Sequence, residues 1–182
     1  MAIALKRSRD GNPANERGAR DGRTKLPKPA APTPLSIAGA FIYPLLAVPA
    51  RSGLMAEIFR NDWPHAAAPI RQVNWNEMTP GAVTDWHRHD LQTDRLIGVI
   101  GVIRLSLWDD RENSPTRGAT AAIQLSSANR GMVLVPPGVW HGLRNETDAP
   151  AAYINLPNQL YDHDDPDNWR LPPEFGEAPL AL

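Results

Sequence analysis

The chain has 182 residues, with 19 lysines and arginines against 20 aspartates and glutamates, and it has no cysteine. This length fits one ordinary domain, and the near-balance of charge argues against a nucleic-acid-binding surface spread over it. The lack of cysteine excludes disulfide bonds and thiolate metal sites, and it fits a cytoplasmic protein. No apolar run approaches the roughly 20 residues of a membrane helix, so neither a nucleic acid nor a membrane is an expected partner.

The first 34 residues differ from the rest of the chain. They are polar, basic and turn-rich, and their last part contains Pro27, Pro29, Pro32 and Pro34. A segment with few large apolar residues and no periodicity does not bury enough surface to fold. We therefore predict a disordered extension over residues 1–34, one domain over residues 35–172 and a tail over residues 173–182.

From Ser36 onward, short apolar segments alternate with turn residues. In one of them, Ile103, Leu105 and Leu107 alternate with polar residues, which is the period-2 pattern of a half-buried strand. No amphipathic helix of more than two turns stands out, so many short strands predict an all-β sandwich or barrel. The expected strands cover residues 38–48, 54–60, 70–78, 94–108, 120–125, 132–136, 141–145 and 151–156. The acidic run over residues 161–167 lacks the glycine and terminal glutamate of a calcium loop and predicts a surface turn.

Two histidines stand two residues apart near the middle of the chain, at His87 and His89. On a strand such residues point to the same face, where they would project together into the space on that side of the sheet. Asp94 and then Gly101 follow them. This pattern predicts a polar site rather than an ordinary apolar core.

A second stretch, residues 131–145, places a third histidine beside a tight turn. Pro136 and Gly138 supply the fixed and positive backbone angles of such a turn, and His141 follows it. Three imidazoles and one carboxylate (His87, His89, His141 and Asp94) form a recognisable ligand set for one divalent ion of Fe, Mn, Ni or Zn. Aspartate is shorter than glutamate, so Asp94 could instead orient a histidine.

Together the two stretches resemble the paired motifs of the cupin superfamily. The first matches G-x5-H-x-H-x4-D-x6-G from Gly81 to Gly101, with aspartate in place of the usual glutamate. The second matches the P-x-G-x2-H-x3-N part from Pro136 to Asn145. The resemblance implies a cupin-type double-stranded β-helix, a small jelly-roll barrel, with both motifs facing its interior.

Within that superfamily the chain is similar to the dTDP-4-dehydrorhamnose 3,5-epimerase group. The segments that carry the similarity are residues 57–63, residues 108–118 with their D-x-R and S-P-T-x-G elements, and the P-x-G-x-x-H-G turn over residues 136–142. The resemblance implies a sugar-nucleotide epimerase or isomerase that acts on a 4-keto-6-deoxyhexose nucleotide in deoxysugar or polysaccharide biosynthesis. It also implies a histidine base, a tyrosine acid, no cofactor and a homodimer.

The candidate catalytic residues are His87, His89 and His141, and either His87 or His89 could be the base because histidine titrates near working pH. The candidate substrate-binding residues are Arg60, Gln92, Arg95, Asp109 and Arg111.

The chain departs from the epimerase pattern at two places. Thr84 stands where the group has an arginine before its catalytic histidine. Asn155 or Leu156 falls where the group has its tyrosine, with Tyr153 and Tyr161 nearby but out of register. Two alternatives therefore stay open: a metal-dependent cupin with oxygenase or isomerase activity, and a ligand-binding cupin without catalysis.

Overall fold

The computed structural model describes residues 30–63 and 69–182, and the predicted disordered extension lies mostly outside these ranges. In the described part of the chain every regular element is a strand. The strands are β1 (Thr33–Pro34), β2 (Phe41–Pro44), β3 (Ala47–Ala50), β4 (Gly53–Ala56), β5 (Asn74–Met78), β6 (Trp86–Arg88), β7 (Asp94–Ile100), β8 (Val102–Trp108), β9 (Thr120–Ser126), β10 (Gly131–Val135), β11 (Trp140–Asn145), β12 (Ala151–Asn155) and β13 (Trp169–Leu171).

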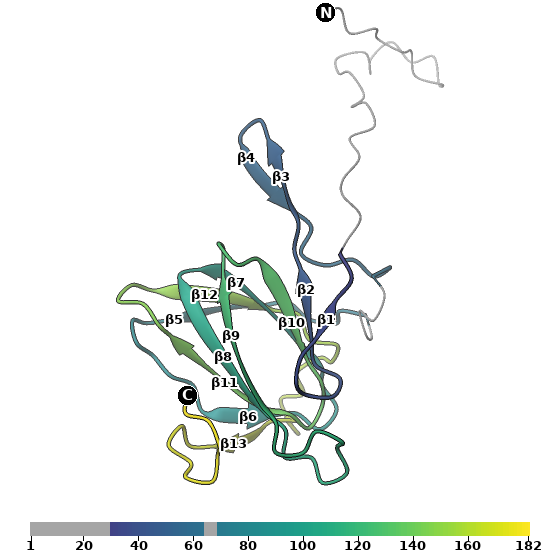
Figure 1. Ribbon diagram of the computed structural model, residues 1–182, viewed down its shortest axis with the longest axis vertical. Coiled ribbons are helices and arrows are strands. Elements are labelled where there is room, and N and C mark those ends of the chain that lie inside the picture. The colour runs from purple at the N-terminus through teal and green to yellow at the C-terminus, as the bar shows by residue number, and fades with distance from the viewer. Residues whose placement is uncertain (1–29, 64–68) are drawn as a thin grey trace, which may run out of the picture.

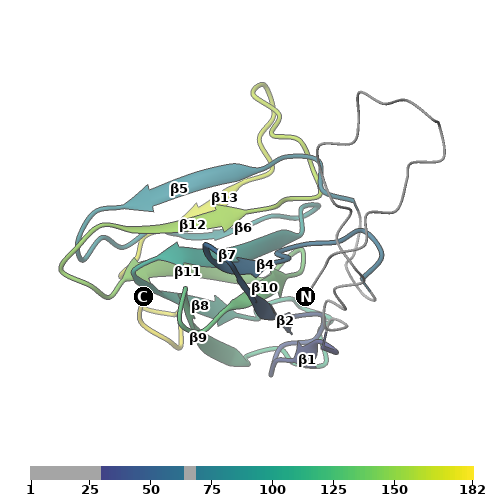
Figure 2. The ribbon, with the colours of Figure 1, turned by 90° about the horizontal axis from the view of Figure 1, so that it is seen from above.

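Two antiparallel sheets form the body of the molecule, and the predicted all-β fold is confirmed (Figure 1). One sheet has the strand order β1-β2-β10-β7-β12-β5, and the other has the order β13-β6-β11-β8-β9. Figure 2 shows β5 and β1 at opposite edges of the first sheet. Strands far apart in the sequence are neighbours in both sheets, which is the connectivity of a jelly roll rather than of a simple meander.

The segment predicted as one strand over residues 94–108 is two strands that lie in different sheets. Gly101 separates them with a φ of 69°, a conformation that glycine adopts without steric cost. A Cβ atom at this position would also lie 2.8 Å from the Cβ of Ala151. The chain therefore turns at Gly101 from the six-stranded sheet, which contains β7, into the five-stranded sheet, which contains β8. The first histidine motif is likewise divided between the sheets, because β6 lies in the five-stranded sheet and faces β7 across the interior.

Apolar side chains fill the space between the sheets and also cover their outer faces. Leu96, Leu105 and Leu143 belong to the cluster between the sheets, and Ile97 belongs to a second cluster on the outer face of the six-stranded sheet. Leu96 and Ile97 are consecutive on β7, so their separation follows from the alternation of side chains along a strand. The same alternation decides which residues of β7 reach the interior.

A two-stranded hairpin, β3–β4, extends away from the body of the molecule (Figure 1). Leu54 and Met55 near its tip are 61% and 42% exposed. The predicted strand over residues 54–60 is shorter than expected, since β4 ends at Ala56. An isolated hairpin of this kind is marginally stable in water unless another surface covers it.

Candidate active site

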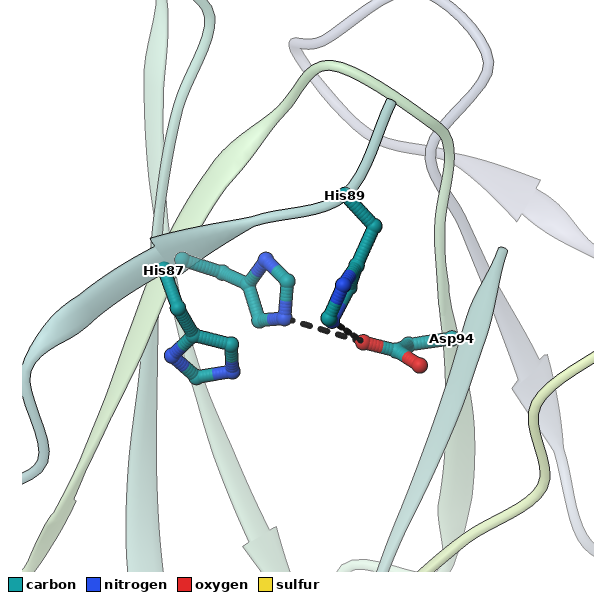
Figure 3. Close-up of side chains that lie close together, drawn as sticks. His87, His89 and Asp94 are labelled. Atoms are coloured by element: carbon teal, nitrogen blue, oxygen red, sulfur yellow. Dashed lines mark hydrogen bonds and ion pairs between the residues drawn. The ribbon is translucent and has the colours of Figure 1, made fainter. Parts of the chain in front are cut away.

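Backbone pairing brings the two histidine motifs together at one end of the barrel interior. His87 on β6 is the register partner of His141 on β11, and their rings lie 4.1 Å apart between centroids. His89 follows β6, with its ring 5.9 Å from each of the other two. Asp94, the first residue of β7, approaches from the opposite sheet (Figure 3). The four predicted site residues therefore form one cluster, with their potential ligand atoms within 4.8 Å of one another.

Main-chain carbonyl groups hold all three imidazole rings by the same ring nitrogen. The Nδ1 atom of His87 lies 3.1 Å from the carbonyl oxygen of Asp85, and that of His141 lies 3.1 Å from the carbonyl oxygen of Val139. The Nδ1 atom of His89 contacts the carbonyl oxygen of Asp167. A carbonyl oxygen only accepts hydrogen bonds, so each Nδ1 carries a proton and each neutral ring keeps its lone pair on Nε2.

Asp94 is the centre of the cluster and is 1% exposed. Its Oδ2 atom lies 3.1 Å from Nε2 of His141 and 3.3 Å from Nε2 of His89. Its Oδ1 atom accepts hydrogen bonds from Nε2 of Gln92 at 2.8 Å and from Nδ2 of Asn155 at 2.9 Å. Burial by itself would raise the pKa of Asp94, but its contacts with the two histidines outweigh burial and hold the pKa well below the usual value.

The environments of His87 and His89 shift their pKa values in opposite directions. Burial, reinforced by the neighbouring His141 ring, lowers the pKa of His87 to about 3. Burial also acts to lower the pKa of His89, but its hydrogen bond to Asp94 and the charge of that carboxylate raise the pKa overall. His87 is therefore a neutral imidazole near pH 7.

Arg95, predicted as a substrate ligand, lies on the opposite face of β7 from Asp94. It is fully buried, its guanidinium lies 5.3 Å from the centroid of the Phe59 ring, and it donates to the carbonyl oxygen of Leu156 at 2.9 Å. The structure thus separates Arg95 from the histidines because adjacent strand residues face opposite ways. Gln92, by contrast, lies in the cluster through its bond to Asp94.

Asp109 and Arg111 form a network of their own beside the cluster. The Asp109 carboxylate accepts hydrogen bonds from Nε and Nη2 of Arg111 at 2.8 and 2.9 Å, and from the hydroxyl groups of Ser114 at 2.6 Å and Thr116 at 2.7 Å. A Cβ atom on Gly138 would lie 2.9 Å from Cδ of Arg111. The D-x-R and S-P-T elements therefore hold the turn that precedes His141, and a substrate-binding role for them stays a prediction.

Arg60 lies in the exposed segment after the hairpin. It pairs with Glu57 at 3.1 Å and with Asp62 at 2.7 Å, and its side chain is 43% exposed. These two carboxylates raise the pKa of the guanidinium. The structure places Arg60 on the outside of the barrel. Its contact with substrate stays a prediction.

The sequence did not single out Asp167, although it helps to hold His89. Its carboxylate accepts the backbone N–H groups of Asp90, Leu91 and Gln92 at 2.7, 2.8 and 3.1 Å, while its carbonyl oxygen contacts His89. The acidic run was predicted as a surface turn, and residues 161–166 of it are exposed. Asp167 is partly buried, unlike residues 161–166, because its carboxylate binds the backbone of the loop between β6 and β7.

Tyr153 and Asn155 both face the barrel interior from β12. Asn155 contacts Asp94, and Tyr153 packs against the cluster of apolar side chains between the sheets. Burial, with the charge of Asp94, raises the pKa of Tyr153 to about 12, so its hydroxyl stays protonated. The alternation of side chains along a strand could have placed Tyr153 on the same face of β12 as Asn155, whereas Tyr161 is exposed and contacts the His163 ring edge-on.

An antiparallel jelly-roll sandwich with a histidine and carboxylate cluster between its sheets defines a cupin-type protein. A family model described as dTDP-4-dehydrorhamnose 3,5-epimerase matches residues 34–170. A probable low-salt glycan biosynthesis epimerase of Haloferax volcanii is 36% identical over 121 residues, which is 66% of this chain and 78% of that protein. The spore coat polysaccharide biosynthesis protein SpsL of Bacillus subtilis is 32% identical over 120 residues, which is 66% of this chain and 79% of that protein.

A solved structure agrees with these sequence matches. The crystal structure of a dTDP sugar isomerase from Desulfovibrio desulfuricans superimposes with a TM-score of 0.76 at 29% identity, over 82% of this chain and 94% of that one. The chain belongs to the dTDP-4-dehydrorhamnose 3,5-epimerase family, as its motifs predicted. In the described residues, no helix has the length and apolar character needed to span a membrane.

Proposed function

We propose that the protein is an epimerase of a dTDP-4-keto-6-deoxyhexose in which His87 is the base. The observation that carries this proposal is the position of its Nε2 atom. The Nδ1 atom of His87 is held by the carbonyl oxygen of Asp85, and in the described part of the chain the Nε2 atom has no carboxylate within ion-pair distance. Its lone pair is therefore available to accept a proton, whereas His89 and His141 contact Asp94.

The chemistry follows from the acidity of a carbon next to a keto group. His87 accepts the proton of that carbon, the C–H electron pair moves into a C=C bond, and the carbonyl oxygen becomes an enolate. A proton returned to the other face of the carbon inverts its configuration and restores the ketone. His87 has a lone pair for the first step because its Nδ1 atom carries the ring proton and its Nε2 atom does not.

Tyr153 is our candidate for the proton donor. It occupies the same face of β12 as Asn155, two residues deeper in the barrel, and its hydroxyl is protonated at neutral pH because burial raises its pKa to about 12. We expect Tyr153→Phe to keep proton exchange at the substrate carbon but to lose the inverted product. Equal product formation by Tyr153→Phe and wild type would rule out this donor.

Glycan or polysaccharide biosynthesis is the setting that the relatives suggest, since the two matched proteins carry those descriptions. The proposed substrate is a small molecule with a thymidine diphosphate group and a 4-keto sugar, in keeping with the family description.

Product analysis by proton NMR tests the proposed function. The wild-type protein is incubated with dTDP-4-keto-6-deoxyglucose, and the ring couplings report inversion at the carbons that flank the keto group. We expect an inverted product with wild type and with His163→Asn, a matched change of an exposed histidine outside the site. We expect none with His87→Asn. Unchanged substrate after incubation with folded wild-type protein would contradict the proposal.

We further propose that the protein is a homodimer in which a second copy covers the β3–β4 hairpin. The hairpin is a separate two-stranded sheet, and Leu46, Leu54 and Met55 on it or beside it are exposed. Light scattering after gel filtration should give twice the chain mass, and Leu54→Lys with Met55→Lys should give the monomer. Ile100→Lys, an exposed residue at the end of β7, is the control. A wild-type monomer at micromolar concentration would contradict the dimer.

A further inference from the structure

The strand that carries His87 is short, and side chains contribute to holding it in position. β6 has three residues and lies between β11 and β13 in the five-stranded sheet. His87 points into the barrel interior, so its neighbours Trp86 and Arg88 point to the outer face of the sheet. Cross-strand pairs of side chains stabilise a sheet, and they matter most for a strand that forms few main-chain hydrogen bonds. Support for the base is therefore expected on the outer face of β6.

Arg88 lies between two tryptophans on that outer face. Its guanidinium carbon is 5.2 Å from the centroid of the Trp140 ring on β11 and 5.4 Å from the centroid of the Trp169 ring on β13. Trp169 is also the register partner of Arg88. A guanidinium at this distance is attracted to the negative face of an indole ring. The three side chains therefore form one stack that joins β11, β6 and β13.

The two indole rings are the contacts that fix the guanidinium. Its Nη2 atom lies 3.6 Å from Oδ1 of Asp90, whose side chain is 47% exposed, and an ion pair of this kind contributes little. Its Nε atom is buried and has no hydrogen-bond partner among the residues that the structure describes. Trp140 is 9% exposed and packs in an apolar cluster, which gives the stack a rigid side.

The stack lies directly behind the histidines. Arg88 follows His87 in the chain, and Trp140 precedes His141, which is the register partner of His87. Trp169 begins β13, which pairs with β6 over the whole length of both strands. Because adjacent strand residues face opposite ways, a movement of the stack on the outer face would move the two facing imidazoles on the inner face.

We propose that Arg88 is a positioning residue, whose stacking between the two tryptophans fixes β6 and so directs Nε2 of His87 at the substrate carbon. The catalytic part of this inference rests on the proposed function, in which His87 removes the proton. A displacement of a reacting group by about 1 Å can cost about 100-fold in rate. Loss of the stack should therefore lower the rate of the chemical step and leave substrate binding largely intact.

Two substitutions that differ in charge test the stack by steady-state kinetics with dTDP-4-keto-6-deoxyglucose. Arg88→Lys keeps a cation that can lie over an indole face, whereas Arg88→Gln removes it. We expect Arg88→Gln to lower kcat by about 10–100-fold with KM changed by less than about twofold, and Arg88→Lys to recover most of the lost kcat. Arg104→Gln is the matched control, since Arg104 lies on β8 of the same sheet and pairs with Glu146 at 3.5 Å. Its kcat and KM should equal those of wild type.

A double-mutant cycle with Trp169→Leu tests whether the arginine and the tryptophan act together. Trp169 is 54% exposed, so this substitution leaves no cavity in the core. If the stack is one unit, the double variant should have the kcat of the more impaired single variant. Losses of kcat that multiply in the double variant would overturn the coupling through the stack.

Nitrogen NMR of protein labelled with ¹⁵N-histidine observes His87 without substrate. In wild type its ring should show the tautomer protonated on Nδ1, because that atom lies 3.1 Å from the carbonyl oxygen of Asp85. The resonances that disappear in His87→Asn assign the ring. We expect Arg88→Gln to shift or split them, and we expect Arg88→Lys and Arg104→Gln to leave them at their wild-type positions.

The outcomes separate this inference from the proposed function. Either a wild-type kcat or unchanged His87 resonances in folded Arg88→Gln would overturn the positioning role, and so would an equal loss of kcat in Arg104→Gln. Absence of product with wild type would contradict the proposed function, and the NMR comparison would still decide whether the stack positions His87. Each variant is first checked for cooperative thermal unfolding. If Arg88→Gln does not fold, Trp169→Leu replaces it in both measurements, with the same expected results.

Discussion

Asp109→Asn should destabilise the protein strongly although Asp109 contacts no histidine in the described structure. The carboxylate is 0% exposed, and it accepts hydrogen bonds from Arg111 on both oxygens and from the hydroxyls of Ser114 and Thr116 on Oδ2. An amide has one acceptor oxygen and one donor group, so Asp109→Asn turns part of this site from acceptor to donor. At least one of the bound donors then faces another donor, and the guanidinium loses its counter-charge.

The size of the effect follows from burial. Removing one partner of a buried charge pair costs about 3–5 kcal/mol, and the Arg111 side chain is 26% exposed, so we expect the lower end, about 3 kcal/mol. For a urea slope of about 2 kcal/mol per M, the unfolding midpoint should fall by about 1.5 M.

Urea unfolding followed by tryptophan fluorescence measures this change. Asp110→Asn is the matched control: its side chain is 43% exposed and pairs with Arg117 at 3.6 Å, so the change should cost less than about 1 kcal/mol. A midpoint of Asp109→Asn within the error of wild type would refute the reasoning. A normal midpoint with a raised KM would instead support the predicted substrate-binding role.

Three further predictions concern stability and the support of the site. The pKa of Asp109 is lowered in the folded protein, so the ionised carboxylate stabilises the fold above the unfolded pKa of about 3.9, and this stabilisation is lost as pH falls through the lower folded pKa. The urea midpoints of wild type and Asp109→Asn should therefore converge below pH ~4. A gap between the two midpoints that does not change with pH would contradict this. Gly98→Ala should cost about 2 kcal/mol or more, because its Cβ would lie 2.5 Å from the backbone carbon of Leu125, and a thermal melt equal to wild type would contradict the close contact. Asp167→Ala should leave the three backbone N–H groups that its carboxylate holds without this partner and cost about 1–3 kcal/mol; an unfolding midpoint equal to that of wild type would contradict its supporting role.

The grouping of His87, His89 and His141 could be predicted from the sequence because two short-range rules cover it. Alternation places His87 and His89 on one strand face, and the proline and glycine turn places His141 at the start of the next strand. The register that pairs His87 with His141 joins residues far apart in the sequence, so alternation along one strand does not predict it. The resemblance to the family motifs is what indicated that the two stretches lie together.

Arg95 is a predicted substrate-binding residue whose position depends on the alternation of side chains along β7. It follows Asp94 directly, yet it lies on the outer face of the sheet with Phe59 because side chains alternate. Alternation alone could have made that distinction. The role of Asp167 could not be foreseen in the same way, because its contacts with residues 90–92 span more than 70 positions and depend on how the loop after β12 folds back.

The D-x-R and S-P-T elements belong to the family pattern, and Asp109 and Arg111 within them are predicted to bind substrate. In the structure the side chains of these elements hydrogen-bond one another, and Arg111 also donates to the carbonyl oxygen of Ala38 at 2.8 Å. A motif can mark a family because it holds a turn in place, and a single sequence does not distinguish this from contact with a ligand.

Deuterium incorporation from D₂O into the carbons next to the keto group of the sugar nucleotide tests the central claim most directly, because it detects proton removal even when no product accumulates. Wild type and His163→Asn should exchange these positions at equal rates, and His87→Asn should exchange them about 10²–10⁴-fold more slowly. Exchange by folded His87→Asn at the wild-type rate would contradict the account, because the proton would then be removed by another group.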